Sequence, residues 1–157
     1  MKTRSLNQNT INDIILLMLR IWLGYEMMKN GKYIFQMPFS ESDRKFFEYW
    51  FGHDLHFPFP LHMAYLAKGA EFFGGLLVLL GLFTRVGAAL IAFTMFIATL
   101  TANLGKNWGV DGTVTVSFCL MAIMIINYGG GRYALASLFR KGRWINWKYL
   151  SANNYHH

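Results

Sequence analysis

Six polar or charged residues interrupt two apolar stretches of the sequence. They are Arg20, Glu26, Lys29 and Asn30 in the first stretch (residues 11–35) and Lys68 and Glu71 in the second (residues 61–84). Ionisable groups inside an apolar span usually face a bundle interior or a water-filled cavity, where they bind polar ligands or relay protons. We therefore predict that these six residues form a ligand-binding site, and we assign no catalytic residue.

The spacing of the charges predicts one polar layer shared by two helices. Glu26 and Lys29 are three residues apart, so they are neighbours on a helix and can pair. We take Asp13 and Arg85 to mark the same end of the two spans. At a rise of about 1.5 Å per residue, Glu26 and Glu71 then both lie about 20 Å from that end, with Lys29 and Lys68 one turn further.

Three interpretations of this layer stay open from sequence. It forms a ligand site in an outward-opening cavity, or it only holds two helices in register, or its charges lie at the membrane interface. The first interpretation predicts that replacing Glu71 by Gln or Ala alters an activity. The second predicts that exchanging Glu71 and Lys68 preserves function.

The composition favours a membrane protein with a single domain. Of 157 residues, 54% are hydrophobic and only 15% are charged, against about 25% charged in a typical soluble domain. We predict an all-α fold: a four-transmembrane-helix antiparallel bundle, one domain over residues 1–157. The expected spans are 11–35, 61–84, 86–105 and 112–129, each about long enough for a hydrocarbon core of about 30 Å.

The segments outside the spans are aromatic or basic. Residues 36–60 form an aromatic outer loop between the first two helices, in which Ser40 can cap a short helix and Pro60 can begin the next span. The basic, tryptophan-rich C-terminal segment is expected to lie at the interface. We expect a tight hairpin at Arg85 between the second and third spans.

The net charge of +7 comes from basic residues that flank the spans. This pattern indicates membrane topology and excludes nucleic acid as the expected partner. The distribution of Lys and Arg predicts a multi-pass protein of the bacterial inner membrane with both termini in the cytoplasm. We see no secretory signal pattern, and we expect His156 and His157 to be remnants of an expression tag.

Other reactive residues give weaker signals. His53, His56 and His62 match no metal-binding spacing, so no metal site is predicted. Cys119 is the only cysteine, which excludes a disulfide within the chain. With no haem-ligand pair, flavin motif or cysteine cluster, we expect no covalently bound cofactor. The expected interface of a homo-oligomer is the stripe of small residues on the third span: Gly87, Thr94, Ala98, Thr101 and Gly105.

The chain resembles the DoxX family of small bacterial membrane proteins over about residues 12–138. The resemblance is carried by four motifs: Arg20-x3-Gly24 with Asn30-Gly31-Lys32, Glu71-Phe-Phe-Gly-Gly75, Gly81-Leu-Phe-Thr-Arg85, and Gly129-Gly-Gly-Arg-Tyr133. It implies a four-helix membrane bundle. Many relatives carry a histidine where this chain has Asn30, so a role tied to that histidine is not transferred. Some relatives are described as membrane subunits of sulfur-compound:quinone oxidoreductases or as partners in redox-stress complexes.

Three functions follow from these observations. The first is an accessory or ligand-binding subunit of a membrane redox system, holding a quinone, a lipid or a small molecule within the lipid bilayer and acting with redox partner proteins. The second is a small transporter, which requires a homo-oligomer because four helices leave little room for a pore. The third is a structural assembly protein without chemistry.

Overall fold

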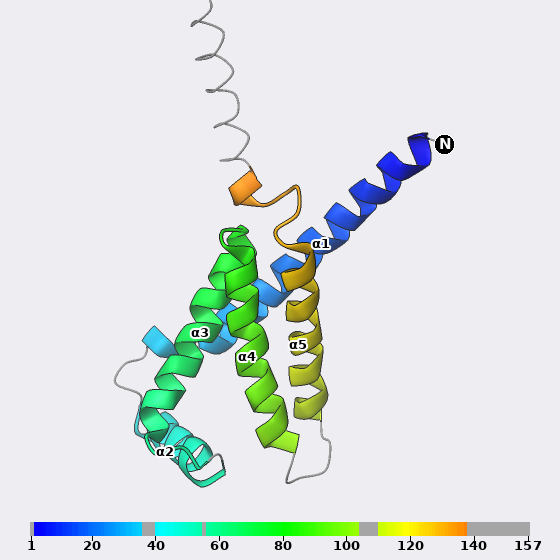
Figure 1. Cartoon of the computed structure of the whole chain (residues 1–157). Coiled ribbons are helices and arrows are strands. Elements are labelled where there is room, and N and C mark those ends of the chain that lie inside the picture. The colour runs from blue at the N-terminus through cyan, green and yellow to red at the C-terminus, as the bar shows by residue number, and fades with distance from the viewer. Residues whose placement is uncertain (1, 36–39, 55, 104–109, 138–157) are drawn as a thin grey trace, which may run out of the picture.

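A computed structural model describes residues 2–35, 40–54, 56–103 and 110–137, and within these ranges every regular element is helical (Figure 1). The long helices are α1 (Lys2–Gly31), α3 (Pro60–Leu80), α4 (Thr84–Asn103) and α5 (Val110–Tyr128). Three short elements lie between α1 and α3: η1 (Lys32–Phe35), α2 (Glu41–Glu48) and η2 (Tyr49–Asp54). The predicted all-α class is confirmed for these residues.

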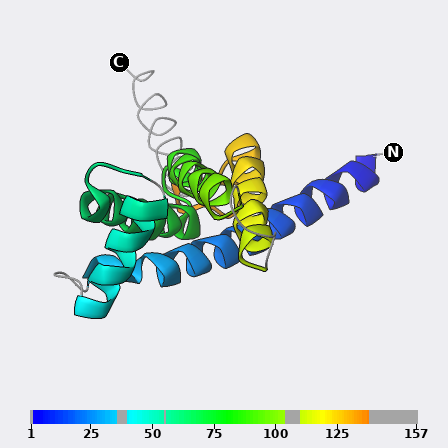
Figure 2. The ribbon, with the colours of Figure 1, turned by 90° about the horizontal axis from the view of Figure 1, so that it is seen from below.

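Helices α3, α4 and α5 follow one another in the chain and pack in that order, while α1 packs chiefly on α3. Figure 2 shows α1 running along one side of the other three long helices. The central core is made of side chains from all four helices, including Leu23, Met27, Val78, Ile91 and Ile125. Each helix therefore contributes one apolar stripe to a common interior.

The connection between α3 and α4 is a three-residue reversal. Gly81 ends α3 in the left-handed conformation (φ 73°), and its N–H donates to the carbonyls of Leu77 and Val78. Glycine suits this position because it lacks the Cβ that disfavours positive φ. Helix α4 begins at Thr84. The predicted tight hairpin is confirmed, but its turn lies at residues 81–83, and Arg85 belongs to α4.

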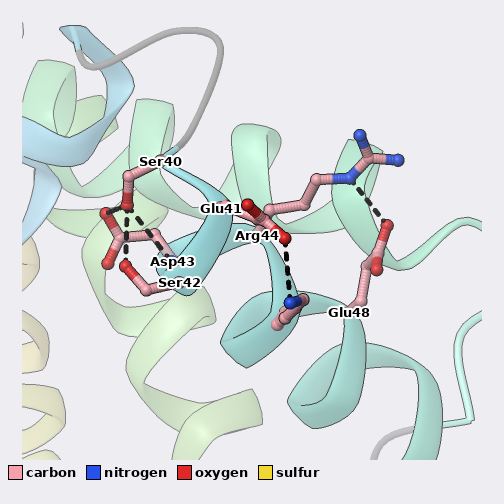
Figure 3. Close-up of polar contacts among 7 residues, drawn as sticks. Ser40, Glu41, Ser42, Asp43, Arg44 and Glu48 are labelled. Atoms are coloured by element: carbon pink, nitrogen blue, oxygen red, sulfur yellow. Dashed lines mark hydrogen bonds and ion pairs between the residues drawn. The ribbon is translucent and has the colours of Figure 1, made fainter.

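The predicted short helix after residue 40 is α2. The Ser40 hydroxyl accepts a hydrogen bond of 3.2 Å from the Asp43 amide, which satisfies one of the unpaired N–H groups of the first turn. Figure 3 shows this cap beside the pair between Arg44 and Glu48, whose Nε and Oε1 atoms are 3.0 Å apart. The pair is exposed, so it stabilises the helix only slightly.

The aromatic segment packs on the start of α3. Phe47 of α2 and Phe51 of η2 are buried against Ala64, together with half-buried rings from η1 and the chain before α3. Phe46 and Tyr49 lie on the opposite, exposed side of the segment. This segment therefore covers one end of α3 with one face and presents aromatic rings outward with the other.

Small residues allow close contact between neighbouring helices. Gly74 of α3 lies against Gly87 of α4, and a Cβ added at Gly87 would lie 2.8 Å from the Gly74 carbonyl oxygen. The Thr99 hydroxyl of α4 lies 3.1 Å from that of Thr115 in α5. Gly87, expected at an interface between subunits, thus forms a contact within the chain. Part of the predicted small-residue stripe, the Thr101 side chain and Gly105, lies outside the described residues.

Pro60–Leu80 is the single helix, among the residues described, that is long and apolar enough to cross a membrane by length and composition. The apolar parts of α4 and α5, Thr84–Leu100 and Gly112–Tyr128, are shorter. The C-terminal segment predicted to lie at the interface falls mostly outside the described residues, as does most of the turn between α4 and α5.

Candidate functional site

Lys68 and Glu71 form a buried ion pair on α3. Lys68 Nζ donates to Glu71 Oε2 over 2.8 Å, and the two side chains are only 15% and 8% exposed. Glu71 lies one turn before Gly74 and Gly75, the glycines that approach α4 and α1. The carboxylate is therefore held where three helices meet, at a position that a lone charge would occupy only at high cost.

The pair leaves hydrogen-bonding capacity unused. Among the described residues no hydrogen bond reaches Glu71 Oε1, and Lys68 donates only to Glu71. An ammonium has three donors, and a carboxylate oxygen accepts more than one bond. The pair can therefore offer one acceptor and up to two donors to a small polar ligand.

Glu26 and Lys29 pair within α1, as their spacing predicts. Their Oε2 and Nζ atoms are 3.5 Å apart, but Lys29 is 57% exposed. Asn30 is also exposed. This second pair is therefore more open to the surroundings than Lys68–Glu71 and contributes less to a buried site.

The two carboxylates do not lie at the same level. A Cβ at Gly75 would touch Gly24 and Met27, and Gly31 lies against the backbone of residues 68–72. Glu71 is thus level with the end of α1 near Gly31, about one helical turn from Glu26. The prediction of equal depth is wrong because the residue count from Glu71 to Arg85 includes the turn after α3 and the start of α4. Helix α3 has already ended at Leu80.

Near the two ion pairs, the contact between α1 and α3 is made by glycines rather than by charges. A Cβ at Gly24 would lie 2.8 Å from the Gly75 carbonyl oxygen, and a Cβ at Gly75 would lie 2.8 Å from that of Gly24. Both recorded ion pairs of this region join residues of a single helix. These two ion pairs therefore do not tie α1 to α3, and the burial of Glu71 needs another reason.

Arg20 lies at a different place from the other predicted site residues. Its side chain is fully buried at the end of α3, where Nε donates to the Val78 carbonyl over 3.0 Å and Nη2 to that of Leu79 over 3.3 Å. Nη1 donates to the Gly130 carbonyl. Because the last carbonyls of a helix lack partners within it, Arg20 satisfies the end of α3 and joins it to the turn after α5.

Two further motif residues meet at this end of the bundle. Gly81 lies directly against Arg20 Nη2 and Ala134, which leaves no room for a side chain. The Asp13 carboxylate accepts a bond of 3.4 Å from the Arg132 amide, in the glycine-rich turn. Sequence motifs from three parts of the chain therefore build one structural junction around Arg20.

An open cleft of about 1080 Å³ lies beside this junction. Its lining comes from the α3–α4 turn, the first residues of α4 and the turn after α5: residues 81–86, 128–131, 134, 136 and 137. Glu71 and Lys68 do not line it. The polar pair and the cleft are thus separate features at different levels of α3.

The described histidines do not cluster with other side chains that could bind a metal. Across the described residues, no three His, Cys, Asp or Glu side chains lie close enough together to hold a metal ion. The ring of His53 stacks on Tyr49 with centroids 4.7 Å apart, and that of His62 lies edge-on to Phe59. Packing contacts therefore account for both rings.

A comparison with protein-family models matches residues 15–104 to DoxX. This match covers more than half of the chain and includes the later part of α1 and all of α3 and α4. The chain belongs to the DoxX family. As a DoxX protein it is a small helical membrane protein, in agreement with the many large apolar side chains on its outer surface. Neither the curated proteins nor the solved structures gave a match.

Two features of this DoxX protein were missed from its sequence. The hydrogen-bond partners of Arg20 are backbone carbonyls, which every residue has, so the residue types in the sequence do not reveal them. Thr84 and Arg85 line the cleft, but the sequence suggested only that Arg85 marks a helix end. The signal that could have revealed the junction is an arginine inside a span combined with glycine-rich turns after two other spans.

Proposed function

We propose that this chain is a four-span subunit of the bacterial inner membrane that binds a small hydrogen-bonding ligand at Lys68 and Glu71. In this proposal α1, α3, α4 and α5 cross the bilayer, and both termini lie in the cytoplasm. Exposed apolar residues on each helix, such as Met18, Phe73, Phe93 and Leu120, support lipid contact around the bundle. The excess of Lys and Arg at one end supports the orientation.

The observation that carries the ligand site is the buried Glu71 carboxylate, one oxygen of which has no partner within the part of the chain that the structure describes. If the charges only held helices in register, an ion pair between α1 and α3 would be expected, but Lys68 and Glu71 belong to the same helix. Burying two charges without such a gain is costly. A ligand that accepts a hydrogen bond from Lys68 and donates one to Glu71 would offset the cost of burying the two charges.

A quinone matches this chemistry better than a purely apolar lipid. A quinone carbonyl accepts a hydrogen bond, and the hydroxyl of its reduced form donates one. The Lys68 ammonium and the Glu71 carboxylate offer the complementary groups side by side. The rings of Phe35 in η1 and Phe72 in α3 lie with centroids 4.6 Å apart and provide an apolar wall near this level. Electron transfer would then depend on redox partner proteins.

The test measures quinone binding in protein extracted with its native lipids. We expect a quinone to co-purify with the natural chain, and a soluble short-chain quinone to raise its Tm in detergent. Glu71→Gln keeps the shape of the side chain but removes its charge, so binding should weaken about tenfold or more. Glu48→Gln is the matched control, because Glu48 is exposed on α2.

A charge exchange separates binding from structure. The double variant Lys68→Glu with Glu71→Lys keeps a pair at the same spacing but reverses donor and acceptor. We expect the double variant to fold and to lose quinone binding. Retention of all activity in this variant would support a structural role instead. Absence of bound quinone, with no Tm change on adding it to the natural chain, would refute the quinone proposal.

A further inference from the structure

The cleft beside the Arg20 junction contains a buried hydroxyl to which the described residues offer no hydrogen-bond partner. Thr84, the first residue of α4, is only 6% exposed and lines the cleft. Its Oγ1 atom faces Gly130, since a Cβ added to that glycine would lie 2.9 Å away. None of the hydrogen bonds recorded for the described residues involves this hydroxyl. A buried polar group is normally satisfied, so Thr84 points to a ligand in the cleft.

Arg85 lines the same cleft and has no ion pair among the described residues. Its guanidinium lies over the turn after α5, with Nε 3.5 Å from where a Cβ of Gly129 would be. The sequence holds no Asp or Glu after Asp111, and the nearby Asp13 carboxylate accepts from the Arg132 amide. The chain therefore supplies no carboxylate after α5 that could neutralise Arg85.

The first turn of α4 adds backbone donors. The Val86 and Gly87 amides both donate to the Phe83 carbonyl. No acceptor is recorded within the described chain for the amides of Thr84 and Arg85, as expected for the first N–H groups of a helix. Helix α4 has 20 residues, and the N-terminus of a long helix carries partial positive charge that favours anions.

We infer that this cleft binds a phosphate group, with the Arg85 guanidinium, the Thr84 hydroxyl and the first amides of α4 as its donors. The glycine turn is not itself a phosphate loop; its lack of side chains leaves room for the group. The rim carries exposed apolar side chains, Phe83, Val86 and Tyr128. The phosphate comes from an anionic phospholipid headgroup, whose acyl chains would contact this rim, or from free phosphate.

The test compares four versions of the full chain in mild detergent: the natural chain, Arg85→Gln, Thr84→Val and Arg132→Gln. Thermal unfolding is followed with short-chain phosphatidylglycerol, short-chain phosphatidylcholine or inorganic phosphate at constant ionic strength. At about ten times its Kd, a bound ligand should raise the Tm by about 3 °C. Arg132→Gln is the control because it removes an exposed cation at the same end that does not line the cleft.

We expect phosphatidylglycerol to raise the Tm of the natural chain and of Arg132→Gln, and phosphatidylcholine to have little effect. Arg85→Gln should weaken binding about tenfold, because a charge-assisted bond is lost. Thr84→Val is nearly the same size and keeps the charge, so it tests the site if Arg85→Gln fails to fold. It should weaken binding severalfold.

The outcome also identifies the source of the phosphate group. A Tm shift with inorganic phosphate equal to that with phosphatidylglycerol, and lost in Arg85→Gln, would support the site with free phosphate as its ligand. The proposal would be overturned if the ligand raised the Tm of Arg85→Gln as much as that of the natural chain. It would also be overturned if Arg85→Gln and Arg132→Gln lost the ligand-induced rise in Tm to the same extent. The absence of any shift in the natural chain would overturn it as well.

Discussion

The Arg20 guanidinium of α1 donates a hydrogen bond to the Gly130 carbonyl, 2.5 Å away and 110 positions later in the chain. The same side chain donates to the last carbonyls of α3, those of Val78 and Leu79. One fully buried cation therefore joins α1, the end of α3 and the turn after α5. No carboxylate of the described residues pairs with it, so its charge is balanced by oriented carbonyl dipoles.

Replacing Arg20 should destabilise the whole bundle. Arg20→Lys keeps the charge, but a single ammonium cannot reach three carbonyls arranged around a planar guanidinium. Each hydrogen bond from a charged donor contributes about 1.5–3 kcal/mol, and a carbonyl left unpaired adds a cost. We expect the free energy of unfolding to fall by about 3 kcal/mol, which corresponds to a Tm lower by about 10 °C.

The control for this measurement is Arg44→Lys, on the exposed side of α2. An exposed pair contributes about 0.5 kcal/mol at most, so this variant should unfold within about 2 °C of the natural chain. Equal Tm values for Arg20→Lys and Arg44→Lys, by tryptophan fluorescence in detergent, would contradict the junction described above.

The long helices could be predicted from sequence because apolar stretches of fixed length leave few alternatives. The sequence places α3 at residues 61–84, and the structure has it at Pro60–Leu80. The end differs because Gly81 adopts positive φ and the chain reverses before Arg85. A count of residues along a straight helix cannot include such a reversal, and this is why the predicted depth of Glu71 was wrong.

The candidate site could be predicted in part for a related reason. Lys68 and Glu71 are neighbours on one helix, so local spacing is enough to pair them. The surroundings of Arg20 depend on the packing of distant segments, which side-chain spacing does not encode. The sequence analysis placed Arg20 and Glu71 in one site because both are charged residues inside a span. In the structure Arg20 bonds to the end of α3, whereas Lys68 and Glu71 form a separate pair with donors and acceptors to spare.

The glycine contact between α1 and α3 predicts a sharp difference between two substitutions. In Gly75→Ala the new methyl would lie 2.8 Å from the Gly24 carbonyl oxygen and 2.9 Å from Met27 Cβ. Backbone cannot move aside cheaply, so overpacking should cost about 1–3 kcal/mol. The gain in helix propensity of about 1 kcal/mol would offset only part of this cost. Thermal unfolding should show a lower Tm.

Gly69→Ala is the matched variant on the same helix. Its methyl would meet only Ile34 Cδ1, at 3.0 Å, which is the flexible end of a side chain. The propensity gain should then equal or exceed the cost, and the Tm should stay unchanged or rise by about 2 °C. A Tm for Gly69→Ala as low as that for Gly75→Ala would show that the backbone contact is not the cause.

The cap of α2 predicts a local effect without a global one. Ser40→Ala removes the acceptor for the Asp43 amide and should destabilise this helix by about 1 kcal/mol. Hydrogen exchange of the amides in the first turn should become about fivefold faster, while the Tm of the bundle changes little. Ser42→Ala, at the second residue of α2, is the control, because the Ser42 hydroxyl contacts Ser40 Oγ, whereas the Asp43 amide donates to Ser40. Similar acceleration in both variants would contradict the capping role.

The buried pair predicts that two changes together cost less than one. Glu71→Gln alone leaves the Lys68 ammonium buried without a counter-ion, and removing one partner of a buried pair typically costs about 3–5 kcal/mol. Lys68→Met alone strands the Glu71 carboxylate in the same way. The double variant, Lys68→Met with Glu71→Gln, removes both charges and should recover most of the loss.

This double-mutant cycle separates stability from ligand binding at one site. The double variant should unfold within about 1 kcal/mol of the natural chain, because its desolvation cost is also gone. It should nevertheless fail to bind quinone, since the ammonium donor and the carboxylate acceptor are both absent. Additive losses of Tm in the cycle would show that Lys68 and Glu71 do not interact. A stable double variant that still binds quinone would place the ligand elsewhere.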